Sequence, residues 1–167
     1  MTVMKYIFAL SCLLAFLGCD DGDRNKPQEG VPESYSYSYS GMMAQPIVSY
    51  EVERGKDGTV TIAYCANSLE AIVYKAPADA LEQIGELARK HKIHHLKRSY
   101  QPSMEILDGY GWHMFLAYEK GYIGSGGSNA WPSDKDWAGI AAINKYLQDF
   151  IDSATEADII ERRPFRR

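Results

Sequence analysis

Three histidines in one short stretch of the chain offer the clearest metal-ligand spacing. His91 and His95 are four residues apart, so on a helix their imidazoles would share a face, as two zinc ligands do. No glutamate lies between them in a metalloprotease arrangement, and the charges of Lys90 and Lys92 repel a cation. We therefore expect a solvated basic helix end here, with no metal and no other cofactor.

A glycine-rich segment, Gly124 to Pro132, follows an expected strand and precedes an expected helix. Backbone N–H groups at such a place can cradle a phosphate. However, the segment lacks a Gly-Lys-Ser/Thr ending, and Asn129 stands where a dinucleotide-binding fingerprint needs its third glycine. We expect a structural turn, and the residues in it best placed to contact a ligand are Ser128, Asn129 and Trp131.

No nucleophile, base and acid stand together at a recognisable spacing. The chain has no Gly-x-Ser-x-Gly elbow. Glu105 and Asp108 could form a carboxylate pair, but Asp108 followed by Gly109 is ordinary turn composition. We expect the protein not to be an enzyme, with a hydrolase whose site is dispersed through the fold as the alternative.

The N-terminus predicts a specific chemical modification. Lys5 precedes an apolar run, Tyr6 to Leu17, which is too short for the roughly 20 residues of a membrane-spanning helix and is typical of an export signal. Gly18 and Cys19 then resemble the site at which a bacterial lipoprotein is acylated and cleaved. We expect residues 1–18 to be removed as a signal peptide, and Cys19 to carry lipid chains such as palmitate that hold the protein on a membrane. An ordinary secretion signal with a chance cysteine is the alternative.

Acidic residues follow the cysteine at once, as Asp20-Asp21-Gly22-Asp23. This cluster resembles the surface-export signal of lipoproteins in some Gram-negative bacteria, although aspartate beside the cysteine means inner-membrane retention in other bacteria. We expect the bacterial cell envelope as the location, with the outer membrane, on either of its faces, favoured over the inner membrane.

Composition limits the remaining possibilities. The 167 residues suit one domain with its own core, and a net charge of −4 gives no electrostatic footprint for nucleic acid. Cys12 leaves with the signal and Cys19 is acylated, so Cys65 has no disulfide partner and is expected to be a small core residue.

The periodicity of the chain predicts an α+β fold. Residues 19–33 are expected to be the lipidated cysteine and a flexible acidic tether of about 20 Å, residues 34–153 a single domain, and residues 154–167 a polar basic tail. The expected strands are 34–40, 47–53, 59–64, 71–74, 112–118 and 122–123, and the expected helices are 77–91 and one beginning at a Ser133–Asp136 capping box. The order ββββαββα predicts an antiparallel sheet of about six strands with two helices packed on one face.

Two turns carry a resemblance to known proteins. Asp108, Gly109 and Trp112 form an Asp-Gly-x-x-Trp turn before a strand, and residues 127–132 form a Gly-Ser-Asn-x-x-Pro turn before a helix. Over roughly residues 34–150 the chain resembles a family of uncharacterised small bacterial proteins, many of them lipoproteins. The resemblance implies the strand order given above and no activity.

These patterns favour a membrane-anchored binding domain. The expected lipid on Cys19 makes the membrane one partner, and an envelope protein or glycan is the other partner that we expect. A purely structural envelope protein is a further alternative.

Overall fold

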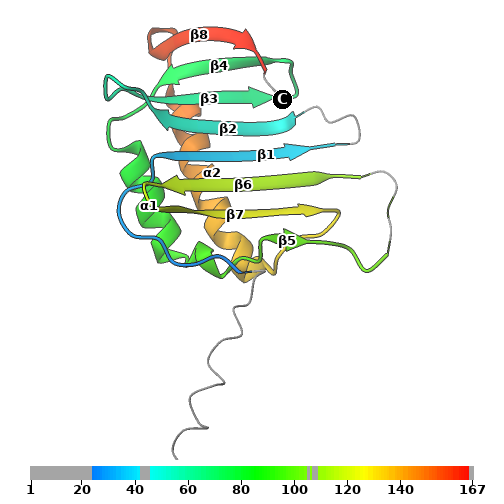
Figure 1. Ribbon diagram of the computed structural model, residues 1–167. Helices are drawn as coiled ribbons and strands as arrows, with labels where there is room; N and C mark the ends of the chain where they lie inside the picture. Colours follow the sequence, from blue (N-terminus) through cyan, green and yellow to red (C-terminus); the bar gives the residue numbers. More distant parts are fainter. Residues whose placement is uncertain (1–23, 42–45, 105, 107–108, 166–167) are drawn as a thin grey trace, which may run out of the picture.

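The computed structural model describes residues 24–41, 46–104, 106 and 109–165, and these form one eight-stranded sheet with two α-helices behind it (Figure 1). The strands lie in the order β5-β7-β6-β1-β2-β3-β4-β8, and every neighbouring pair is antiparallel except β5 and β7. The strands are β1 (Ser34–Ser40), β2 (Pro46–Arg54), β3 (Val60–Ala66), β4 (Glu70–Lys75), β5 (Ser99–Tyr100), β6 (Gly111–Tyr118), β7 (Gly121–Ser128) and β8 (Ile159–Pro164). The helices are α1 (Ala80–Lys90) and α2 (Asp134–Ser153), with short 3-10 turns η1 (Ile93–His95) and η2 (Glu156–Asp158).

The alternation in β1 sorts its side chains between the two faces of the sheet. Tyr35 and Tyr37 are buried on the helix side, while the serines between them face the other way. Tyr37 pairs with Tyr50 of β2 and Met114 of β6, so the central strands place large apolar groups in one row beneath the helices. Their burial in a single cluster supplies the main stabilisation of the fold.

Both helices bury one stripe against that row. In α2, Ile140, Ile143 and Leu147 recur at helical spacing and are fully buried. The hydroxyl groups of buried tyrosines then find partners on the same helix: Tyr35 Oη donates to Asn144 Oδ1 at 2.8 Å. These bonds fix the helix over the middle of the sheet, because an unsatisfied buried hydroxyl would be costly.

Several expectations are confirmed. The class is α+β, both predicted hairpins are present as β2–β3 and β6–β7, and the helices pack on a sheet. Ser133 caps α2 by accepting a hydrogen bond from the Asp136 amide at 3.3 Å. Gly85 inside α1 lies close to another segment, since a Cβ there would lie 2.7 Å from Cδ of Pro32.

The expected count of six antiparallel strands is wrong, because β5 and β8 complete a mixed sheet of eight. β8 falls in the segment 154–167, which we expected to be a tail, and it pairs with β4 from Glu70 to Tyr74. Its sequence is mostly charged, with Glu161, Arg162 and Arg163. Backbone hydrogen bonds to β4 hold this segment in the sheet. Its charged side chains suit an edge strand because they oppose pairing with other chains.

The expected loop 124–132 is wrong in its first half. Residues up to Ser128 continue β7, in which every position from Gly121 pairs with β6. Glycine is a poor strand former by itself, but here it gives room to bulky neighbours. A Cβ on Gly126 would lie 2.6 Å from Nδ1 of His113, so the β6 side chains occupy the space that the glycines leave.

The part of the expected tether that the structure describes, from Arg24 onward, is in contact with the sheet. Asn25 is buried, and its side-chain amide donates to the carbonyl groups of Leu96 and Gly124 at 3.0 and 2.8 Å. Its Oδ1 accepts from the Gly124 amide at 3.0 Å. One asparagine side chain thus replaces a neighbouring strand along this part of the β7 edge.

Candidate functional site

The face of the sheet opposite α1 and α2 is not covered by any other helix or strand of the described chain (Figure 1). By register, Ser36 of β1 lies between Glu51 of β2 and Phe115 of β6, and Ser38 lies beside His113. The half-buried serines of β1 thus form a hydroxyl stripe across the middle of this open face, made of Ser34, Ser36, Ser38 and Ser40.

Two aromatic rings stand exposed on the open face. Phe115 and Tyr122 are 43% and 48% exposed, and their rings stack with centroids 5.1 Å apart at an angle of 25°. The guanidinium of Arg98 lies 6.0 Å from the Tyr122 ring centroid, within the range of a cation–π contact. Large apolar rings that remain in water on a sheet face are a recognised sign of an interaction site.

A groove lies beside this aromatic stack, over β5, β7 and β6. Its volume is about 440 Å³, in the range of ligand sites. Three glycines of β7, Gly124, Gly126 and Gly127, are among its lining residues. The polar residues that line the groove are Arg98, Ser99, Gln101, His113, Ser125 and Ser128, and none of the described lining residues carries a carboxylate.

This arrangement suits a ligand that is apolar on one side and polar on the other. An exposed ring can stack on the C–H face of a sugar, while hydroxyl, amide and imidazole groups bond its hydroxyls. An extended peptide would use the same rings for its side chains. Among the described residues that line the groove, none is an acid that could orient His113 as a base.

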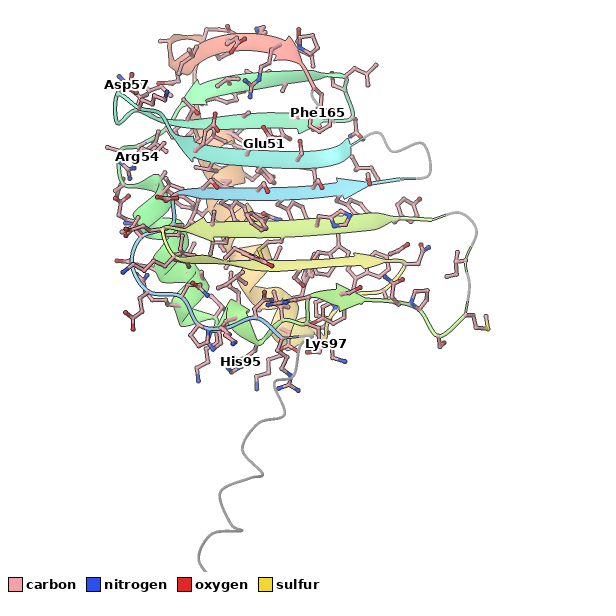
Figure 2. The ribbon with its side chains drawn as sticks, in the orientation of Figure 1. Glu51, Arg54, Asp57, His95, Lys97 and Phe165 are labelled. Atoms are coloured by element: carbon pink, nitrogen blue, oxygen red, sulfur yellow. The ribbon has the colours of Figure 1, made fainter. Side chains whose placement is uncertain are left out.

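On the other half of the open face, an ion pair joins β2 to β8. Figure 2 shows Glu51 on this face, and its Oε2 lies 3.8 Å from an amino group of Arg163, which reaches over β4 and β3 from β8. Small residues lie in the two strands between them, among them Cys65, which is only 2% exposed. Burial raises the pKa of the Cys65 thiol, and the thiol donates to the Ser68 carbonyl at 3.2 Å. The expectation that Cys65 is a core residue is confirmed, and this thiol is a poor nucleophile.

The histidine cluster does not assemble a zinc site. α1 ends at Lys90, and Lys92 adopts a left-handed conformation with φ of 53°, so His91 and His95 do not share a helix face. Burial, together with His95 and Lys92, lowers the pKa of His94. Within residues 24–41, 46–104, 106 and 109–165, no group of three metal-ligating side chains lies close enough to hold an ion.

The three predicted contact residues lie in different settings. Ser128 lines the groove. Asn129, with φ of 50°, forms the turn between β7 and α2, and its Oδ1 accepts from the Tyr110 amide at 2.9 Å. Trp131 is 44% exposed but is not a lining residue of the groove. A ligand role for all three residues stays a prediction.

Other predicted features lie outside the described residues. These are the signal 1–18, Cys19, the acidic cluster 20–23, and the carboxylates Glu105 and Asp108. In the described part of the chain, neither helix has both the length and the apolar character that crossing a membrane requires.

Sequence reasoning missed Phe115 and Tyr122, although a signal was available. In β6 the apolar residues Trp112, Met114 and Leu116 alternate with a second row that contains Phe115. A strand with one face in the core needs only the first row, so an aromatic residue in the second row marks an exposed apolar group.

Comparison with known proteins gives no family assignment. No protein-family model matches the chain, and no curated protein matches it either. The resemblance to small bacterial lipoproteins therefore stays a prediction.

Proposed function

We propose that this chain is a lipid-anchored protein of the bacterial cell envelope that binds a glycan in the groove on the open face of its sheet. The observation that carries the proposal is the exposed Phe115–Tyr122 stack beside a groove lined by glycines and polar side chains. A ring platform next to hydroxyl and amide groups matches the two-sided chemistry of a sugar.

The anchor is supported by the sequence around Cys19, in which a short apolar run and a small residue precede the cysteine. We expect Cys19→Ala to prevent acylation and to move the protein from the membrane fraction to the soluble fraction. Fractionation of cells and the mass of the mature protein measure this. A Cys19→Ala protein that stays in the membrane fraction would contradict the anchor.

We also propose that the protein binds without catalysis. The thiol of Cys65 is buried and its pKa is raised by that burial. His113 is the imidazole of the groove, and no carboxylate among the described lining residues orients it. A catalytic triad needs such an acid.

The glycan proposal is tested with defined oligosaccharides. The acyl-free chain from residue 20 is titrated with chitohexaose, cellohexaose and maltohexaose, and with a muramidase digest of peptidoglycan, by isothermal calorimetry. We expect one of these probes to bind, and we expect Phe115→Ala or Tyr122→Ala to weaken binding by roughly tenfold, the value of about one aromatic contact.

Trp131→Ala is the matched control, because Trp131 is similarly exposed but is not a lining residue of the groove. If Trp131→Ala alone abolishes binding, the ligand sits at the turn and not in the groove. If no glycan binds and the Phe115 and Tyr122 variants lose an envelope protein from a crosslinking experiment instead, the ligand is a protein.

A further inference from the structure

The contacts of Arg24 and Asn25 with the fold restrict how a molecule anchored at Cys19 can lie on a membrane. Arg24 forms a β-bridge with Lys97, and Asn25 is bonded to Leu96 and to the β7 edge. Only residues 20–23 separate Cys19 from this fixed point. Five Cα–Cα steps join Cys19 to Arg24, so the chain between them spans at most about 18 Å.

The surface around this point is basic. Figure 2 shows His95 and Lys97 at the end of the molecule where the described chain begins, next to η1. Lys90 ends α1 and Lys92 precedes η1, so these lysines and Lys97 frame the same short turn, and all three are exposed. None of the three forms an ion pair with another residue that the structure describes. We name this set, Lys90, Lys92 and Lys97, the basic end.

The charge of the basic end contrasts with that of the molecule. The chain as a whole carries −4, and the tether contributes Asp20, Asp21 and Asp23. An anionic bilayer would repel such a tether. Ammonium groups held within about one Debye length of the lipid phosphates, roughly 10 Å, offset that repulsion.

We propose that the basic end is a membrane-docking surface that contacts anionic phospholipid headgroups, so that the sheet stands on its β5 edge with β8 farthest from the bilayer. The proposal rests on the proposed acylation of Cys19. Charge complementarity and the short tether carry it. In this orientation the open face of the sheet is perpendicular to the membrane, so its groove opens sideways into solvent.

Residue-resolved lysine acetylation tests this orientation. The chain from Cys19 contains the whole described unit with its core, and Cys65 is buried, so a maleimide phospholipid in a vesicle couples selectively at Cys19. Coupled protein is acetylated on vesicles of pure phosphatidylcholine and on vesicles containing phosphatidylglycerol, and mass spectrometry gives a rate for each lysine. Chemical coupling separates this test from acylation in cells, which the Cys19→Ala fractionation measures, and from glycan binding.

We expect the basic end to be acetylated at least about threefold more slowly on the phosphatidylglycerol vesicles, and 1 M salt to remove the difference by shortening the Debye length to about 3 Å. Lys56 and Lys75 are internal controls, since they are exposed in the β2–β3 turn and in β4, away from η1. Equal rates at the basic end on both vesicles, or equal protection of Lys56 and Lys75, would overturn the proposal.

Discussion

Gly127 lies where β7 passes closest to the indole of Trp112. The Trp112 Nε1 group donates to the Ala130 carbonyl at 2.9 Å, and a Cβ on Gly127 would lie 2.6 Å from that nitrogen and would overlap the carbonyl oxygen. We expect Gly127→Ala to lower the free energy of unfolding by about 1–3 kcal/mol, as overpacking does in a tight core. Urea denaturation measures the change.

Gly124 provides a matched control in the same strand. A Cβ there would lie 3.5 Å from the rings of Phe115 and Tyr122, an ordinary contact distance. Gly124→Ala should therefore change stability by less than about 0.5 kcal/mol. If the two variants are equally stable, the close approach of Gly127 to Trp112 does not constrain this strand.

At the scale of elements, the segment 24–33 belongs to the fold. Asn25 satisfies three backbone groups, and Pro32 packs against Gly85 of α1. We expect a chain that begins at Ser34 to be less stable than one that begins at Arg24 by at least about 2 kcal/mol, because it leaves buried backbone groups of Leu96 and Gly124 unpaired. Denaturation midpoints and hydrogen exchange of the Gly124 amide compare the two chains, and equal values for both would contradict this account.

The elements that could be predicted are those in which apolar and polar residues repeat at strand or helix spacing, or which begin or end at a recognisable turn or cap. The alternation of β1, the turn chemistry of the two hairpins and the Ser133 cap all depend on neighbours in sequence, and each was found at the expected place. The two-residue alternation of β1 also predicted that its tyrosines share one face of the sheet.

The elements that could not be predicted depend on partners far away in the chain. β8 pairs with β4 through its backbone, and the glycines of β7 form a strand because Trp112, His113 and Phe115 fill the space beside them. Asn25 is held by a contact across 99 positions. The groove combines β5, β6 and β7, so a site built across strands could not be located before their order was known.

At the scale of the whole molecule, tyrosines couple folding to alkaline pH. Burial, followed by the nearby Tyr39, raises the pKa of Tyr37 to about 12, and burial with Tyr64, Tyr37 and Asp152 raises that of Tyr50 to about 12. Unfolded tyrosine ionises near pH 10. The native state therefore binds these protons more tightly, and the resulting stability is complete below pH 10 and is lost as the pH rises to about 12.

We expect the melting temperature to fall steeply over that interval, and the absorbance of tyrosinate at 295 nm to rise in two stages. Tyr37→Phe removes one of the titrating hydroxyl groups and should make the decline shallower, with little change at pH 8. A single titration of all the tyrosines near pH 10 would contradict the burial of these rings.

The three hydrogen bonds by which Asn25 holds Leu96 and Gly124 have a mechanical consequence for an anchored molecule. Tension between a membrane and a captured ligand would enter the fold at Arg24. It would act on the β-bridge of Arg24 with Lys97 and on the three hydrogen bonds of Asn25. Their rupture would release at most residues 24–29, because Arg89 and Ala117 still hold Gly30 and Glu33 by hydrogen bonds. The linkage would lengthen by up to about 20 Å, since extended chain adds about 3.3–3.6 Å per residue. All eight strands lie after this segment in the chain. Under load, the segment would therefore extend before any strand of the sheet unfolds.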